Sequence, residues 1–553
     1  MPKIPATRSF RITIESILGG HSLLSHFADA DQFRSSIGID PASPLNDDPD
    51  LNAFKTNASG YLRPSSFKHV SGAGIELNNA PLWIKAQPKT SSFYVLDSAG
   101  SAYVTTYTAS PVTALSDGGS LSGGSGNGME YYDNYIYMAK NTTIARYGPL
   151  DGTPVFDGDY WAGTLGKTAL TNPSFPQFVS GITGLNHANH VMHRHSDGKL
   201  YIADVQGGQG VLHMISTTKT TVEGDTDAGS TYQKLVFGYG LYPTAIESYG
   251  SNLVITLWEG NTTQSNMHAK VAFWDTNSQN FNQITWNEYP DRFISSVKNV
   301  NGTLYFTSSG VPTSLARGFR VMQYVGGNSF AEVRMIENGF MPMGGAVDGD
   351  SRRLLFGTLT YDVSAAPGCI YSINLRKAGI AKSGALFNIA RLPGTTTSLL
   401  ITASGLSQVT GIMAGWTTGS AGSGGTNNSI SHTNGLVTDV SATTNQVWWS
   451  QTYRLGQPFK ITKVRFPMAS TVGGQQIVTP KIYTDENAGI TYTLKAISNT
   501  NFPGKRAAVF RSDQNGGPIT GDHNFWLELL WSGADLATVA LPIIIEGEYT
   551  EDN

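Results

Sequence analysis

The feature of this sequence that most constrains its fold is a turn followed by a short apolar strand, which recurs at a nearly constant spacing. The best copies carry leucine at the start of the strand, and the spacings from one leucine to the next are 53, 51 and 50 residues. These leucines are Leu200, Leu253, Leu304 and Leu354. Such a regular spacing over several copies indicates a repeat architecture.

Each copy is followed, after a polar loop, by a second apolar strand and another turn. The clearest second strands are Val271–Asp275, Val321–Tyr324 and Ile370–Ile373. Weaker copies of the first strand lie at Phe93–Leu96, Tyr135–Met138 and Gly411–Trp416. The chain thus carries about seven units of about 50 residues, the size of one four-stranded blade of a β-propeller.

Other repeat architectures fit less well. An all-helical solenoid needs apolar residues with a period of 3.6, which these segments lack. A row of separate sandwiches would place strands about every 8 to 12 residues, with no longer repeat. Charged residues make up only 14% of the chain and glycine contributes 62 residues, a composition typical of short strands joined by turns. We therefore predict an all-β chain with an about seven-bladed β-propeller at residues 60–440. No blade carries the Trp-Asp ending of WD40 units, the kelch double glycine or the sialidase-type box.

Residues 1–59 are expected to form a short N-terminal arm. Apolar and polar residues alternate from Phe10 to Glu15, which predicts one half-buried strand that can pair with the chain's own sheet or with a neighbour's. The spacing of Phe33 and Ile37, after two aspartates that can cap a helix, predicts a short helix within residues 29–39.

The pattern changes after about Ser441. Alternating apolar residues predict several strands, with turns between them that contain glycine. The clearest apolar positions are Phe459, Ile461, Ile482, Tyr483, Phe525, Leu527, Leu529, Trp531, Ile543, Ile545 and Tyr549. We predict that residues 441–553 form a small C-terminal β-sandwich of jelly-roll type.

Charge and cysteine content exclude several function classes. The net charge is −4 and no run of lysine or arginine occurs, so nucleic acid is not an expected partner. The single cysteine, Cys369, has no partner for a disulfide and no neighbouring cysteine or histidine for a zinc site. The first residues lack the features of a signal peptide, and no apolar stretch approaches the roughly 18 to 20 residues of a membrane-spanning helix. The chain is expected to be made in a cytoplasm and to stay free of membranes.

The densest group of titratable residues is a histidine cluster ahead of the strand at Leu200. It consists of His187, His190, His193 and His195. In an extended segment His193 and His195 lie on one face, about 7 Å apart, and with a third donor they could bind a transition metal. Metal-ligand sets usually have helical or tight-loop spacing, however, and need carboxylates that orient the histidines, which the sequence does not reveal. The favoured interpretation is polar residues that line the inner strand or a loop of one blade, with no metal.

Two further groups offer binding hypotheses. The acidic residues Glu223, Asp225 and Asp227 alternate in one loop, which is compatible with calcium but lacks the other features of an EF-hand, so a solvated turn is favoured. Tryptophans could form a sugar-stacking face if several reached one surface, although packing between blades is the favoured interpretation. They are Trp83, Trp161, Trp258, Trp274, Trp286 and Trp416.

No local motif indicates an enzyme. The sequence has no nucleophile elbow, zinc-protease helix, P-loop or dinucleotide fingerprint, so no catalytic, cofactor-binding or metal residue is assigned, no cofactor is expected and the binding residues stay unknown. Glycoside hydrolysis needs only two carboxylates about 5 to 10 Å apart, which distant blades can supply. A polysaccharide-degrading hydrolase or lyase therefore remains an alternative.

Both ends of the chain carry short segments that resemble virion structural proteins of uncultured tailed bacteriophages. The segments are Ile12–Ser16 with Gly19–Ser22, Gly60–Pro64, Ile477–Tyr483, Asn499–Arg506 and Leu541–Ile545. The resemblance implies a component of a phage particle, and it names neither the position nor a ligand.

The leading hypothesis is accordingly a non-enzymatic structural protein of a phage tail, baseplate or virion surface. It would contact other virion proteins and copies of itself, since a propeller and a sandwich supply broad surfaces for assembly. A receptor-binding protein that docks host surface glycans through one propeller face is the first alternative, and the hydrolase or lyase is the second.

Overall fold

The computed structural model of the 553-residue chain describes most of its strands and turns. The described residues are 8–16, 20–22, 32–37, 62, 68–69, 77, 79–90, 92–106, 113–114, 128–139, 142–165, 170, 190–215, 235–259, 268–277, 285–310, 318–336, 342, 344–349, 353–358, 369–375, 386–391, 400–407, 411–417, 428–433, 446–469, 471–472, 477–485, 490–512, 518–532 and 539–550. The chain divides into two compact units. One, here called the propeller unit, comprises residues 69–368 and 396–432, and the other, the terminal unit, comprises residues 1–68, 369–395 and 433–553.

Five four-stranded antiparallel sheets follow one another along the propeller unit, and within each sheet the strands pair in chain order. The first contains β6 (Pro81–Ala86), β7 (Ser92–Asp97), β8 (Ala102–Thr106) and β9 (Thr113–Ala114). The second contains β10 (Met129–Tyr132), β11 (Tyr135–Ala139), β12 (Ile144–Gly148) and β13 (Val155–Asp157), and is followed by the π-helix η1 (Tyr160–Thr164). The third contains β14 (Met192–Arg194), β15 (Leu200–Gln206), β16 (Gln209–Ile215) and β17 (Leu235–Tyr239). The fourth contains β18 (Leu241–Tyr249), β19 (Asn252–Glu259), β20 (His268–Trp274) and β21 (Thr285–Glu288). The fifth contains β22 (Phe293–Val300), β23 (Thr303–Ser309), β24 (Phe319–Gly326) and β25 (Ser329–Ile336).

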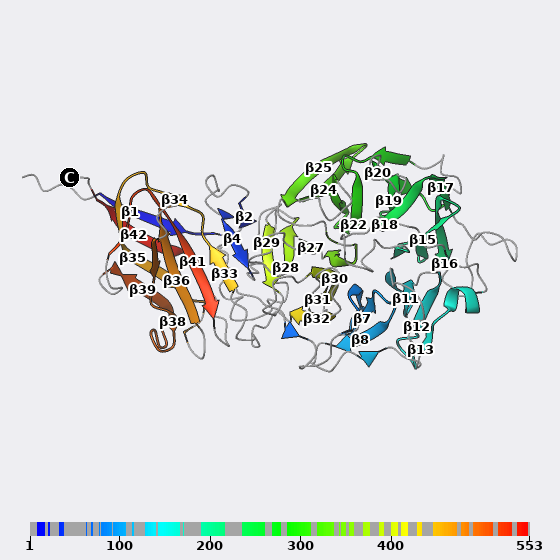
Figure 1. The fold of residues 1–553 in the computed structure, drawn as a ribbon, viewed down its shortest axis with the longest axis horizontal. Coiled ribbons are helices and arrows are strands. Elements are labelled where there is room, and N and C mark those ends of the chain that lie inside the picture. Colours follow the sequence, from blue (N-terminus) through cyan, green and yellow to red (C-terminus); the bar gives the residue numbers. More distant parts are fainter. Residues whose placement is uncertain are drawn as a thin grey trace, which may run out of the picture. The chain divides into compact units, whose positions relative to one another are not determined.

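Two more four-stranded sheets complete the series. One, after the 3₁₀ turn η4 (Gly344–Ala346), has the order β26 (Val347–Gly349), β27 (Arg353–Thr358), β28 (Cys369–Asn374) and β29 (Leu386–Arg391). The other has the order β30 (Leu400–Ser407), β31 (Gly411–Thr417), β32 (Asn428–Thr433) and β5 (Lys68–His69). The described residues thus form seven four-stranded sheets, consistent with a β-propeller, and Figure 1 shows the sheets of the propeller unit arranged about a common centre.

The sequence repeat corresponds to the second strand of successive sheets. Leu200, Leu253, Leu304 and Leu354 lie at or next to the start of β15, β19, β23 and β27, and none is more than 1% exposed. The turn before the strand is as tight as its sequence predicts: at Asn301-Gly302, which joins β22 to β23, both residues have positive φ, 54° and 78°. Two such residues form the turn that matches the twist of a hairpin. The prediction of an all-β repeat is confirmed.

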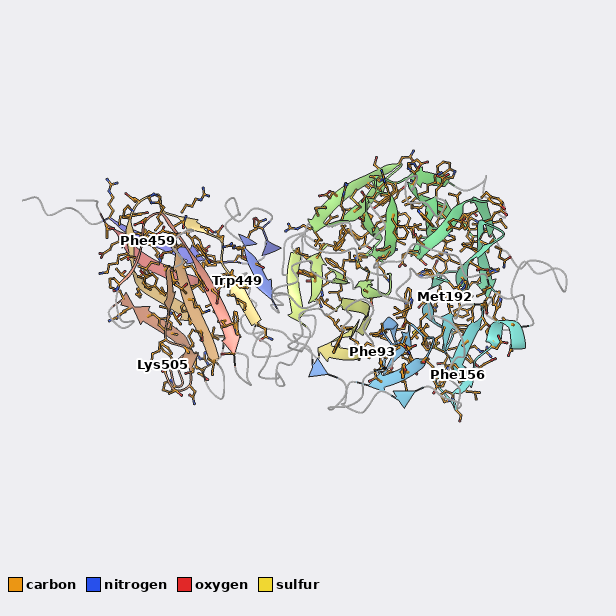
Figure 2. All side chains as sticks on the ribbon, viewed as in Figure 1. Phe93, Phe156, Met192, Trp449, Phe459 and Lys505 are labelled. Carbon is orange, nitrogen blue, oxygen red and sulfur yellow. The ribbon has the colours of Figure 1, made fainter. Side chains whose placement is uncertain are left out.

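The fourth sheet of the propeller unit is buried on both faces because it packs against the third sheet on one side and the fifth on the other. Tyr201 of β15 and Trp274 of β20 belong to one core cluster, with their rings edge to face at 5.6 Å. On the other face of the fourth sheet, Val254 of β19 packs in a cluster with Phe306 of β23. Strands with two buried faces require continuous apolar runs rather than alternation. This explains the apolar runs in the repeat. Figure 2 shows how densely side chains fill these sheets around Phe93 and Met192.

The terminal unit contains two larger antiparallel sheets. One has the order β1 (Ser9–Ile14), β42 (Ile543–Tyr549), β35 (Phe459–Pro467) and β39 (Ala507–Arg511), with β40 (Ile519–Gly521) also paired to β35. The other has the order β37 (Ile490–Thr493), β36 (Ile477–Thr484), β41 (Asn524–Ser532), β33 (Gln446–Trp449) and β4 (Ser35–Ile37), with β34 (Tyr453–Arg454) on β41 and β38 (Ile497–Ser498) on β36. A short parallel pair, β2 (Gly20–His21) and β3 (Gln32–Phe33), lies between the two N-terminal strands in the sequence.

The N-terminal strand is present where the alternation predicts it and pairs within the chain. β1 runs antiparallel to β42, with Ile12 opposite Ile545. The short helix predicted within residues 29–39 is wrong for the residues described there, which form β3 and β4. The physical reason is pairing with a distant segment, because β4 hydrogen-bonds to β33 and places Ser36 opposite Trp448. Backbone pairing of this kind overrides a weak local helical pattern.

Candidate functional site

Charged or titratable side chains occupy one equivalent position in six successive four-stranded sheets, on first strands that all belong to the propeller unit. Each lies on the first strand of its sheet. Its register partner is the residue of the second strand that comes directly after the apolar position of the repeat. The pairs are Lys85 with Tyr94, Glu130 with Tyr137, His193 with Tyr201, Glu247 with Val254, Lys298 with Tyr305 and Asp348 with Leu355. We call these six residues the charge ring.

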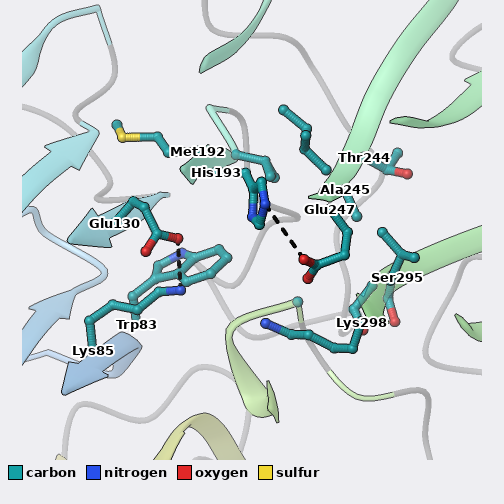
Figure 3. A pocket seen from close by; sticks show the side chains of 15 residues that line it. Trp83, Lys85, Glu130, Met192, His193, Thr244, Ala245, Glu247, Ser295 and Lys298 are labelled. Atoms are coloured by element: carbon teal, nitrogen blue, oxygen red, sulfur yellow. Dashed lines mark hydrogen bonds and ion pairs between the residues drawn. The ribbon is translucent and has the colours of Figure 1, made fainter. Parts of the chain in front are cut away.

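Five members of the charge ring line one cavity of about 200 Å³. The cavity is bounded by the first strands of five sheets together with η4. Its lining residues are Trp83, Lys85, Glu130, Val191, Met192, His193, Thr244, Ala245, Ile246, Glu247, Ser295, Ser296, Val297, Lys298 and Gly344. Figure 3 shows the side chains of Lys85, Glu130, His193, Glu247 and Lys298 turned toward this space from their separate strands.

The first two charges of the ring form an ion pair. Lys85 Nζ lies 3.0 Å from Glu130 Oε2, and the side chains are 23% and 15% exposed. Burial acts to raise the pKa of Glu130, but Lys85, His193 and Lys298 together outweigh it, Lys85 most of all, and the pKa is lowered. Burial likewise acts to lower the pKa of Lys85, and Glu130 and Asp348 reverse this so that the pKa is raised. Both groups are therefore held in their charged forms.

His193, on β14 of the third sheet, is held by Ser248 and Glu247 on β18 of the fourth sheet. Its Nε2 lies 2.8 Å from Ser248 Oγ and 3.5 Å from Glu247 Oε1. The same hydroxyl lies 2.8 Å from Nδ1 of His195, so Ser248 orients both imidazoles. Burial lowers the pKa of His193, and the nearby Glu247 and Glu130 carboxylates offset this only in part. His193 is therefore mainly uncharged near neutral pH.

The other histidines of the sequence cluster have structural contacts. His190 is fully buried, with Nδ1 3.1 Å from the Ala203 carbonyl and 3.5 Å from Asp204 Oδ1. On the other side of that carboxylate, His213 Nε2 lies 3.3 Å from Oδ2. His187 lies outside the described residues. Among the side chains that the structure places, no group of three or more histidine, cysteine or acidic residues could hold a metal ion.

The tryptophans considered for a sugar-stacking face do not gather at one surface. The acidic loop that contains Glu223, Asp225 and Asp227 lies outside the described residues. Trp161, Trp258, Trp274 and Trp416 are buried, and Trp83 lines the cavity. Trp286 is 41% exposed and carries the Lys270 ammonium 4.4 Å from its ring centre. Of the six tryptophans considered for a sugar-stacking face, one is therefore exposed.

Sequence reasoning identified His193 but missed the other members of the charge ring. A signal for them exists, because Glu247, Lys298 and Asp348 each lie six residues before the leucine of their repeat, and His193 lies seven before its leucine. Aligning the repeats on those leucines places Glu247, Lys298 and Asp348 in one column and His193 one position away. The sequence alone does not show that this column faces a shared cavity.

Comparison with known proteins gives a fold likeness at most. No protein-family model matches the chain, and no curated protein matches it. Among solved structures it is similar to the β-propeller domain of Cps50 (Swd1) from Myceliophteria thermophila, with 10% identity, a TM-score of 0.38, and coverage of 66% of this chain and 99% of that one. It is similar to Raptor from Chaetomium thermophilum, with 13% identity, a TM-score of 0.42, and coverage of 70% of this chain and 30% of that one. It is also similar to the Pan2 WD40 domain from Neurospora crassa, with 8% identity, a TM-score of 0.41, and coverage of 66% of this chain and 95% of that one.

Proposed function

We propose that the chain is a non-catalytic structural component of a bacteriophage virion, in the tail, baseplate or particle surface, which acts through contacts with other virion proteins and with copies of itself. The observation that carries the proposal is the distribution of exposed large apolar side chains among the described residues. They are Val155, Tyr239, Trp286 and Val325, at 62%, 78%, 41% and 55% exposure. All four belong to the propeller unit.

These four residues lie in four successive sheets, and three of them lie on the outermost strand. Val155 is in β13, Tyr239 is at the end of β17, and Trp286 is in β21. An outermost strand also presents unpaired backbone groups along its free edge. Apolar side chains beside such an edge favour contact with another protein.

The cavity supports a non-catalytic role better than a hydrolase. Hydrolysis of a glycoside needs a carboxyl group that stays protonated to act as the acid, beside a second, ionised one. In the cavity Lys85 holds Glu130 ionised and lowers its pKa. No helix of the described chain is long and apolar enough to cross a membrane.

Within the same proposal, we infer that the two sheets of the terminal unit form a β-sandwich. Phe459 of β35 and Phe525 of β41 belong to different sheets, are both fully buried, and have ring centres 5.6 Å apart. Packed aromatic residues between two sheets are what a sandwich core requires. The jelly-roll connectivity stays a prediction. A sandwich that includes β1 and β4 would add a second broad surface for assembly.

Two measurements test the proposal: whether the chain is found in virus particles, and what mass the purified chain has in solution. Proteomics of sedimented virions is expected to find several copies per particle, and light scattering is expected to find self-association of the purified chain. The variant Tyr239→Ser with Trp286→Ser is expected to weaken that association at least about tenfold, because aromatic side chains often carry the largest share of interface energy. Lys463→Ser in the terminal unit is the control. A chain that is absent from particles and monomeric at all concentrations contradicts the proposal.

A further inference from the structure

One cation of the charge ring, Lys298, has no partner among the side chains that the structure describes. Lys85 is paired with Glu130, and His193 with Glu247 and Ser248. Lys298 Nζ, in contrast, makes no hydrogen bond or ion pair with any side chain that the structure describes, although it is close enough to lower the pKa values of Glu130 and His193. Figure 3 shows its ammonium directed into the cavity. A partly buried ammonium without a partner is costly unless a ligand or water meets it.

An acidic group with free capacity faces the same cavity. Glu247 Oε1 accepts the backbone N–H of Ser248 at 3.0 Å and lies 3.5 Å from His193 Nε2. A carboxylate has about four acceptor positions on its two oxygens. Among the described residues no hydrogen bond or ion pair involves Oε2, so Glu247 can still accept a hydrogen bond from a positively charged donor.

The rest of the lining carries apolar side chains and hydroxyl groups that already have partners. Trp83, Val191 and Met192 supply apolar surface. Thr244 and Ser295 line the cavity, but their hydroxyls are engaged with Thr256 and Thr307, both at 2.8 Å. The cavity therefore offers one open positive group, one open negative group and an apolar wall.

From this geometry we propose that the cavity binds a small zwitterion, of the class of an amino acid, whose carboxylate meets Lys298 and whose ammonium meets Glu247. A simple anion would also face the carboxylates of Glu130 and Glu247, and a simple cation would face the ammonium groups of Lys85 and Lys298. A molecule with both charges satisfies both open groups at once. The cavity volume of about 200 Å³ is enough for such a molecule.

The experiment is calorimetric titration of the purified full chain at pH 7.5 with glycine, L-glutamine and γ-aminobutyrate, which differ in size and charge separation. Acetate and methylammonium, which carry one charge each, are titrated in parallel. At least one zwitterion is expected to bind at least about tenfold more tightly than either singly charged ion, because only the zwitterion makes both charge-assisted contacts. Binding by acetate as tight as by the best zwitterion overturns the proposal, and so does absence of binding by all three zwitterions at millimolar concentration.

Two variants locate the site. Lys298→Met and Glu247→Gln are each expected to weaken binding of the zwitterion at least about tenfold. Lys463→Met and Glu546→Gln remove the same groups from an ion pair of 2.8 Å in the terminal unit and are expected to leave binding unchanged. Thermal unfolding of each variant shows that it is folded. Unchanged affinity in folded Lys298→Met or folded Glu247→Gln contradicts the assignment, whether or not the chain is found in virions.

Discussion

Asp204→Ala is expected to lower the free energy of unfolding by about 3–5 kcal/mol, the cost of removing one partner from a buried charged group. Asp204 is fully buried and lies within 3.5 Å of His190 and 3.3 Å of His213, both also fully buried. Gln206 donates a further hydrogen bond to it at 3.1 Å. Alanine removes the carboxylate that these groups share inside the core, while His190 keeps its contact with the Ala203 carbonyl.

Urea denaturation of the wild type and the variant measures this effect. Asp204→Asn is the matched variant, because it keeps the shape and one acceptor oxygen and is expected to cost less than alanine. The control is Asp197→Ala, which removes an aspartate from an exposed turn of the same sheet. The Asp197 carboxylate accepts a hydrogen bond from the Tyr201 hydroxyl at 2.7 Å. A cost of less than about 1 kcal/mol for Asp204→Ala would show that the cluster does not hold β14, β15 and β16 together.

Phe459→Ala is expected to destabilise the terminal unit by about 3–5 kcal/mol, the usual cost of removing a large aromatic side chain from a core. The ring is fully buried and lies 5.6 Å from Phe525 and 6.2 Å from Phe10, so it joins three strands from both ends of the chain. Figure 2 labels it among the closely packed side chains of these sheets.

Thermal unfolding measures the loss of stability, and hydrogen exchange of the folded variant shows which strands lose protection. Amides of β1, β35, β41 and β42 are expected to lose protection in Phe459→Ala, because they share the disrupted core. Phe156→Ala, which changes a half-buried ring of the propeller unit, is the control that should spare these amides. If protection falls in β35 and β42 but not in β41, the two sheets do not share a core and the sandwich is wrong.

The fold could be predicted from the sequence wherever structure follows from a local pattern. The apolar strand after a turn, repeated at Leu253 and Leu304, corresponds to β19 and β23 because hairpins are local and their turn residues fix the register. The alternation from Phe10 to Ile14 predicted β1 for the same reason. The pairing partner of β4 could not be predicted, because Ser36 lies opposite Trp448, more than 400 residues away in the chain.

The candidate site could be predicted only in part, for a related reason. The histidine cluster stood out because its members are close together in sequence, yet His190 and His193 have different surroundings: His190 is buried against Asp204, whereas His193 faces the cavity. Lys85 and Glu130 are 45 residues apart and show no local signature. Only the stacking of sheets brings successive repeats to one cavity, so the site arises from tertiary structure.

The central claim is that successive repeats place interacting charges around one cavity, and the Lys85–Glu130 pair tests it most directly. The measurement is a double-mutant cycle with Lys85→Met, Glu130→Gln and the double variant, by urea denaturation at pH 7.5. The 3.0 Å ion pair between adjacent sheets predicts an interaction energy of about 1 kcal/mol or more, so that the double variant is less destabilised than the sum of the single variants. Strictly additive effects would contradict the account, because they would mean that these two residues do not meet.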